Sequence, residues 1–192
     1  MKQRFLSPNL IFVFIIIMFA AITRLIPHWP NFTPIAAIAL FGGATLEKKY
    51  LAFIIPLIAL FISDLIIGLY PAMPAIYISF IITVLIGIYI SKNVKAHNIL
   101  LASLTSSIIF FIITNFAAWI GNPLYPNNIT GLIESYIAGL AFFNDGKYGI
   151  SMFLNEVISG LFFNALLFGI YYITKLYFPS IAAKSNRQNS YI

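Results

Sequence analysis

The sequence predicts an all-α polytopic membrane protein, with six transmembrane helices and one short interfacial or re-entrant helix. Three observations support this fold class. The chain of 192 residues is 61% hydrophobic and only 8% charged, which excludes a soluble globular domain. Apolar runs near 20 residues long, enough to cross a bilayer, recur along the chain. Lys and Arg gather at the ends of these runs, so the net charge of +6 favours membrane orientation over nucleic-acid binding.

The apolar runs predict the spanning elements in order. They fall at 8–25, 34–46, 50–70, 74–91, 98–121 and 149–178. Two starts carry a capping hydroxyl before a proline, at Ser7-Pro8 and at Thr33-Pro34. The second run is short. It can span only if the residues before it extend it, if the bilayer thins locally, or if it borders a water-filled cavity.

A shorter stretch at 129–143 has helical periodicity but is too short to be a seventh span. Its apolar residues recur at i, i+3, i+4 and i+7, while Thr130, Glu134 and Ser135 fall on the other side. Such a helix, with a glutamate on its polar face, is predicted to lie at the interface or to dip partway into the membrane.

The basic residues set the orientation. All but Arg24 and Lys147 precede the first run or follow the second, fourth and sixth: Lys2, Arg4, Lys48, Lys49, Lys92, Lys95, Lys175, Lys184 and Arg187. The loops 71–73 and 122–128 carry no charge. The positive-inside rule therefore places both termini in the cytoplasm. Residues 1–181 are expected to form one transmembrane bundle, and 182–192 a polar cytoplasmic tail.

Four polar or charged side chains are predicted to share the outer third of the membrane: Arg24, Asp64, Asn115 and Glu156. Asp64, for example, falls about 9 Å below the outer end of its run. A carboxylate near mid-bilayer costs about 2.5–3.5 kcal/mol on insertion scales, so its presence needs a reason. Two interpretations remain open. The charges either form a buried ion-pair network that sets helix register, or they line a ligand pocket that opens to the outer face.

Neighbouring aromatic and polar residues are candidates for the same pocket. The loop after the first run supplies His28, Trp29 and Asn31, which offer stacking and hydrogen bonds. Trp119 lies one helical turn from Asn115, although Trp also belongs to the ordinary interfacial belt and Asn can instead join two helices. The predicted ligand-binding set is Arg24, His28, Trp29, Asn31, Asp64, Asn115, Trp119, Tyr125 and Glu156.

Signatures of catalysis and of metal binding are missing from the sequence. The chain has no Cys, and it contains no H-E-x-x-H, no G-x-S-x-G and no phosphate loop. His28 and His97 are predicted at opposite faces of the membrane, so they cannot share a metal. We therefore expect no catalytic residue, no metal, no cofactor and no nucleic-acid partner.

The stretch 31–44 closely resembles the opening motif of DUF6580, a bacterial family of unknown function that carries a transport label. Further matches are Ile62-Ser63-Asp64, Thr114-Asn115-Phe116 with Trp119, Tyr125-Pro126, Gly131-Leu132, Tyr136 and the stretch 165–169. Two departures stand out. The family usually has a Gly-Asp step where this chain has Ser159-Gly160, and 144–154 resembles an insertion. Glu156 is a candidate replacement for the missing aspartate.

That family is similar to the substrate-binding S components of energy-coupling factor transporters, which have about six helices and a vitamin site roofed by external loops. The resemblance implies a binding component for uptake of a vitamin-like molecule, located in the bacterial cytoplasmic (inner) membrane. A corrinoid, thiamine, biotin or a queuosine precursor would each be compatible.

The resemblance also implies three partners: the lipid bilayer, a small-molecule ligand and an energising transmembrane protein with ATPases. The A-x-x-x-A docking motif of many S components is absent from 8–25, and Ala39 with Gly43 is its nearest substitute. The alternative function is an intramembrane enzyme, or an assembly or scaffold protein without transport activity.

Cysteine scanning can test the predicted topology, because the chain has no native Cys. Cys introduced at Lys49, Lys95 or Asn186 should resist an impermeant thiol reagent in intact cells, whereas Cys at Asn127 should react. Labelling of Asn186→Cys from outside would require a seventh span and would contradict the shared depth of the polar side chains.

Overall fold

The computed structural model describes residues 31–141 and 151–177, together with the single residues Ile11, Ile15, Met18, Ile22, Leu25 and Trp29. It contains six helices in these ranges: α2 Ile35–Thr45, α3 Lys49–Ile67, α4 Met73–Ile90, α5 Ala96–Gly121, α6 Ile129–Ala141 and α7 Met152–Tyr177. No strand occurs among the residues described, so the predicted all-α class is confirmed there. Most of the first apolar run and the tail 182–192 lie outside these residues.

Four of the helices, α3, α4, α5 and α7, are long and apolar enough to cross a membrane. Large apolar side chains remain exposed along them, including Ile66, Leu85 and Ile173. An outward apolar surface of this kind suits contact with lipid and would be unusual in a soluble monomer. The structure thus supports a membrane protein with four candidate spans in its described residues. It does not confirm the six spans predicted from the sequence.

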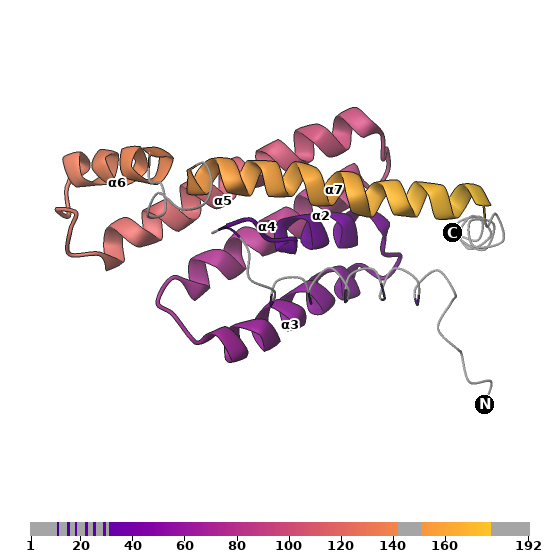
Figure 1. Cartoon of the computed structure of the whole chain (residues 1–192), viewed down its shortest axis with the longest axis horizontal. Coiled ribbons are helices and arrows are strands. Elements are labelled where there is room, and N and C mark those ends of the chain that lie inside the picture. Colours follow the sequence, from indigo (N-terminus) through magenta and orange to yellow (C-terminus); the bar gives the residue numbers. More distant parts are fainter. Residues whose placement is uncertain are drawn as a thin grey trace.

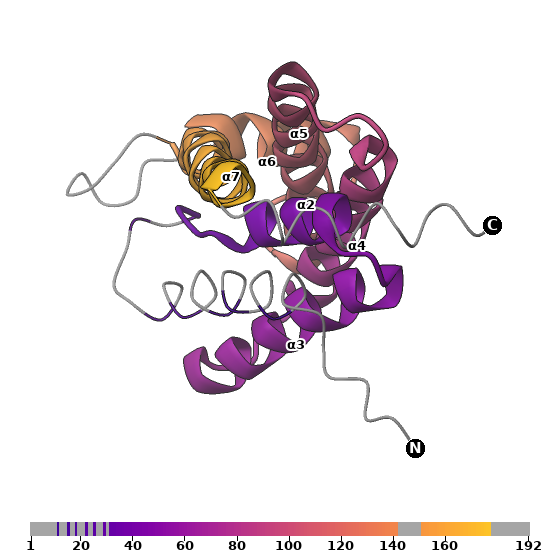
Figure 2. The same ribbon diagram turned by 90° about the vertical axis from the view of Figure 1, so that its right-hand side faces the viewer.

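The short helix α2 lies in the middle of the bundle, with α3, α4, α5 and α7 around it (Figure 2). Its 11 residues cover about 16 Å, roughly half of a hydrocarbon core. Every residue from Ile35 to Ala44 is buried. A helix that is apolar on all sides must be covered on all sides, and here the neighbouring helices provide that cover. The second apolar run therefore packs inside the protein as a helix too short to span by itself.

Helices α2 and α4 touch through glycine backbones. A Cβ atom on Gly43 would collide with the Val84 carbonyl oxygen and would lie 3.0 Å from the Cα of Gly87. A Cβ on Gly87 would likewise collide with the Leu40 carbonyl oxygen. The sequence suggested that Ala39 and Gly43 dock a transmembrane partner. The structure departs from this, because both residues are buried and Gly43 packs inside the bundle.

The short helix α6 begins at Ile129, as predicted, and has 13 residues, too few to cross a membrane. It lies beside α5 and the beginning of α7 (Figure 1). Its buried residues are Gly131 and Ser135, which lie one turn apart. Ile129 and Ile133 are exposed, so α6 turns small side chains to the protein and large apolar ones outward. The sequence had grouped Ser135 with the exposed polar side.

Substitution of Gly43 by Ala should lower the melting temperature of the purified protein. The added methyl group meets backbone atoms of α4, and overpacking of this kind costs about 1–3 kcal/mol. Gly169→Ala is the matched control, because a Cβ at Gly169 meets nothing within 4 Å and should leave the melting temperature unchanged. A Gly43→Ala protein of normal stability that loses a partner protein would restore the docking interpretation.

Candidate ligand-binding site

A cavity of about 210 Å³ lies among α4, α5, α6, α7 and the turn that precedes α2. Its polar lining residues are Asn31, Thr114, Asn115 and Glu156. Three of these four belong to the set predicted from the sequence, and they come from widely separated parts of the chain. The structure therefore brings Asn31, Asn115 and Glu156 to one place, while Thr114 was missed.

Asn31 sits in a turn that is tied to α7. Its φ angle of +59° is left-handed, a conformation that Asn adopts more readily than most residues. The Asn31 Nδ2 donates to the carbonyl of Met152 at 3.4 Å, and the Asn31 carbonyl accepts from Ser159 Oγ at 3.3 Å. These two bonds hold the turn against the first two turns of α7, where Glu156 lies.

Glu156 is the buried carboxylate of the cavity. The residue before α7, Ser151, accepts a hydrogen bond on its Oγ from the backbone N–H of Leu154 at 3.3 Å, which caps the helix start. Glu156 therefore lies about one turn inside α7, and it is only 3% exposed. Its Oε1 has no hydrogen-bond partner among the residues described. A buried charge without a partner is costly, which marks Glu156 as a functional candidate.

Asn115 contributes an oxygen to the same cavity. Its Nδ2 donates to the Phe111 carbonyl one turn earlier, at 2.9 Å. The Oδ1 packs directly on Gly139 of α6, where any Cβ would collide with it. This close approach explains the glycine at that position. Gly131, Ser135 and Gly139 follow a four-residue spacing, the signal in the sequence that could have predicted the contact of α6 with α5.

Aromatic rings form the apolar part of the wall. Phe110, Phe111 and Phe153 all line the cavity. The rings of Phe111 and Phe153 lie 4.8 Å apart, and the ring of Tyr136 lies 5.7 Å from that of Phe111. The Tyr136 hydroxyl also donates to the Ile112 carbonyl at 2.7 Å. Rings from α5, α6 and α7 thus link the three helices around the cavity, which sequence reasoning did not foresee.

Asp64 lies outside the lining of this cavity. It is fully buried in α3, and its Oδ2 accepts a hydrogen bond from the Tyr77 hydroxyl of α4 at 3.1 Å. Helix α3 packs on α2 and α4, whereas α7 packs on α2, α5 and α6. Asp64 and Glu156 were expected to meet because their depths agree, but they belong to different parts of the bundle.

The other described residues of the predicted ligand-binding set do not line this cavity. Trp119 Nε1 donates to the Pro126 carbonyl at 2.9 Å and so braces the loop between α5 and α6, in which Tyr125 is half-buried. Trp29 is 46% exposed and makes an edge contact with Phe32, at a centroid distance of 5.8 Å. Arg24 and His28 lie outside the described residues.

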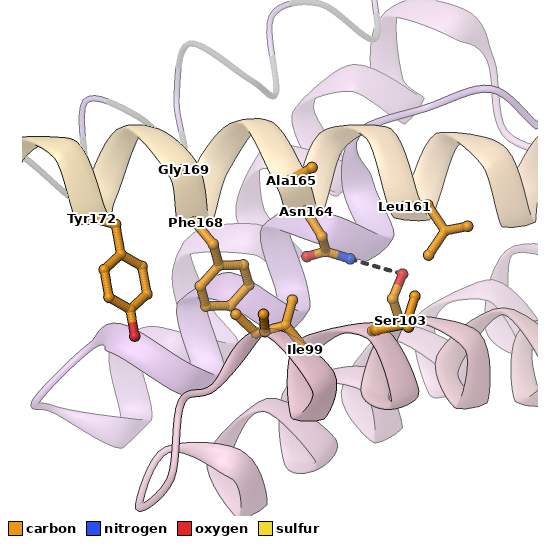
Figure 3. A pocket seen from close by; sticks show the side chains of 10 residues that line it. Ile99, Ser103, Leu161, Asn164, Ala165, Phe168, Gly169 and Tyr172 are labelled. Atoms are coloured by element: carbon orange, nitrogen blue, oxygen red, sulfur yellow. Dashed lines mark hydrogen bonds between the residues drawn. The ribbon is translucent and has the colours of Figure 1, made fainter.

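A second, larger cavity of about 410 Å³ lies between α5 and α7 (Figure 3). Asn164 Nδ2 donates to Ser103 Oγ at 3.0 Å across it, and Figure 3 shows the amide oxygen turned away from Ser103. Exposed residues such as Leu100 and Tyr172 line it, so it opens at the surface of the bundle. None of the residues predicted to bind ligand lines this groove.

The ionisable residues do not gather into a metal site. In the described ranges, no group of three or more His, Asp or Glu side chains could hold a metal ion.

These features define a helical protein with four candidate membrane spans and a buried cavity that contains one carboxylate. The chain belongs to DUF6580, a family of unknown function, whose profile matches residues 4–181. No curated protein and no solved structure matches the chain. The comparisons thus establish the family named by the sequence motifs, and they provide no support for the further likeness to S components.

The two buried carboxylates should respond in opposite ways to neutral replacement. Asp64→Asn should lower the melting temperature of the ligand-free protein, because a hydrogen bond to a charged group contributes about 1.5–3 kcal/mol. Tyr77→Phe should reproduce part of that loss. Glu156→Gln should raise the melting temperature, because it removes a charge that no described residue pairs. An equal loss of stability in Asp64→Asn and Glu156→Gln would make Glu156 a structural residue.

Proposed function

We propose that this protein is a membrane-embedded binding component for the uptake of a small, vitamin-like solute from outside a bacterial cell. It would reside in the cytoplasmic membrane with six spans, the short α6 and both termini in the cytoplasm. The observation that carries this proposal is the buried Glu156, whose Oε1 has no hydrogen-bond partner among the described residues, in a cavity that it shares with Asn31 and Asn115. Ionisable groups inside membrane proteins usually line ligand or ion paths.

The position of the cavity along the helices supports access from outside. Ile76 lies three residues after the start of α4, Asn115 six residues before the end of α5, and Glu156 four residues after the start of α7. The start of α4 and the end of α5 adjoin the uncharged loops 71–73 and 122–128, whereas the segment before α7 contains Asp145 and Lys147. The opposite ends of the three helices carry Lys92, Lys95 and Lys175. By the positive-inside rule, the cavity belongs to the outer half of the membrane.

The size of the cavity favours a small solute. Pockets for drug-sized ligands usually measure about 300–1,000 Å³. The cavity at Glu156, at about 210 Å³, falls below that range. A solute built on one or two rings fits this volume better than a corrinoid does.

The composition of the lining favours binding over catalysis. Among the described lining residues, Glu156 is the sole ionisable group. Acid–base catalysis commonly needs a donor and an acceptor placed on either side of the reacting atoms, and a single carboxylate supplies one of them. The intramembrane enzyme therefore receives no support from the cavity. Uptake would still require energy, and an energising transmembrane partner with ATPases remains part of the proposal.

Mass spectrometry of co-purifying small molecules tests the proposal. A solute should elute with the wild-type protein and should be depleted about tenfold or more in Glu156→Gln, since the loss of about 1.4 kcal/mol weakens binding tenfold. The matched control is Glu134→Gln, because Glu134 is an exposed carboxylate on α6. It should retain the solute at the wild-type level.

The same variants can be compared in cells. Cells that depend on this protein for an external nutrient should stop growing with Glu156→Gln and should grow normally with Glu134→Gln. If the wild-type protein and both variants carry identical small molecules and support identical growth, the binding function at this cavity is wrong.

A further inference from the structure

We infer that the solute is a small organic monocation whose N–H group pairs with Glu156 inside an aromatic cavity. This inference rests on the proposed function, and it adds the charge and the hydrogen-bonding character of the ligand. It follows from three features of the lining: the balance of charge, the direction of the hydrogen bonds and the presence of phenyl rings.

The described lining of the cavity contains a carboxylate and no basic side chain. Glu156 is its single ionisable side chain among the described residues, and Asn31, Thr114 and Asn115 are uncharged. Oε1 of Glu156 has no hydrogen-bond partner in the described part of the chain. A neutral donor would bond Oε1 but leave its charge unbalanced, and an anionic solute would add a like charge at close range. A cation with an N–H group both donates to Oε1 and balances the charge.

The polar neighbours of Glu156 each donate one hydrogen bond to the backbone. Asn31 Nδ2 donates to the Met152 carbonyl at 3.4 Å, Asn115 Nδ2 to the Phe111 carbonyl at 2.9 Å, and Thr114 Oγ1 to the Phe110 carbonyl at 2.8 Å. Because each acceptor is a backbone carbonyl, these bonds also fix the orientation of the two amides. The three side-chain oxygens remain as acceptors, and each Asn amide keeps a second N–H. Together with the carboxylate of Glu156, the lining has more acceptors than free donors, which favours a ligand with N–H or O–H groups.

The apolar walls also favour positive charge. Phe110, Phe111 and Phe153 line the cavity. The face of a phenyl ring attracts a cation within about 6 Å of its centre, and the attraction increases when water is excluded. The same rings provide an apolar surface for the carbon skeleton of the solute. A primary ammonium group on an alkyl arm attached to one ring satisfies both the carboxylate and the aromatic walls.

The other buried carboxylate does not share this character. Asp64 accepts a hydrogen bond from Tyr77 and does not line the cavity. The preference for a cation should therefore depend on Glu156 alone.

Three probes with one phenyl ring separate the possible charges: benzylammonium, benzyl alcohol and benzoate. The full-length protein is placed in lipid nanodiscs, with empty nanodiscs as a control for partition into lipid, and saturable binding is measured by calorimetry. Wild-type protein should bind benzylammonium at least about tenfold more tightly than benzyl alcohol, a difference of about 1.4 kcal/mol. Benzoate should show no saturable binding.

Substitutions then assign the preference to one carboxylate. Glu156→Gln should bind benzylammonium and benzyl alcohol with equal affinity, while Glu156→Asp should retain the order of the wild-type protein. Glu134→Gln, on the exposed side of α6, should behave as wild type. The melting temperature of each variant shows that loss of preference does not come from unfolding.

Two outcomes would overturn the inference. One is equal binding of benzylammonium and benzyl alcohol by the wild-type protein, or the absence of saturable benzylammonium binding. The other is a preference for the cation that survives in Glu156→Gln. Either outcome leaves the proposed function to its own test, because a neutral or anionic solute that co-purifies in a Glu156-dependent manner would still establish the cavity as the binding site.

Discussion

The close crossing of α2 and α4 is the constraint on which the rest of the bundle depends. Gly43 and Gly87 allow the two backbones to touch, and any side chain at either position would strike a carbonyl oxygen of the other helix. This contact seats a short, wholly apolar helix in the centre of the protein. The four long helices then pack around α2, and their outer faces carry the large apolar side chains that suit lipid.

Contacts near the helix ends position the elements that surround the cavity at Glu156. The Asn31 turn is bonded to α7, Ser151 caps α7, and Gly139 lets α6 approach Asn115. The two Asn31 bonds satisfy backbone carbonyls with side-chain donors, the Ser151 bond satisfies a backbone N–H, and the contact at Gly139 is steric. A carboxylate without a described partner is a cost to stability that a ligand-binding role explains.

The sequence suggested Glu156, Asn115, Asn31 and Asp64 for one site, and the structure places the first three, but not Asp64, in the lining of one cavity. Depth along the membrane normal follows from counting residues at 1.5 Å each, so it can be read from the sequence. Position around the bundle axis depends on which helices are neighbours. Asp64 belongs to α3, which packs on α2 and α4, and its carboxylate meets Tyr77.

Composition and apolar run length by themselves determined the helical class, the membrane character and the start of α6, because these follow from transfer of side chains and backbone out of water. The burial of α2, the use of Gly43 inside the bundle and the composition of the cavity were decided only in the tertiary structure. The sequence of an apolar helix does not show whether lipid or protein covers it, because both environments are equally poor in water. Packing alone distinguishes them, through backbone contacts as close as the one between α2 and α4.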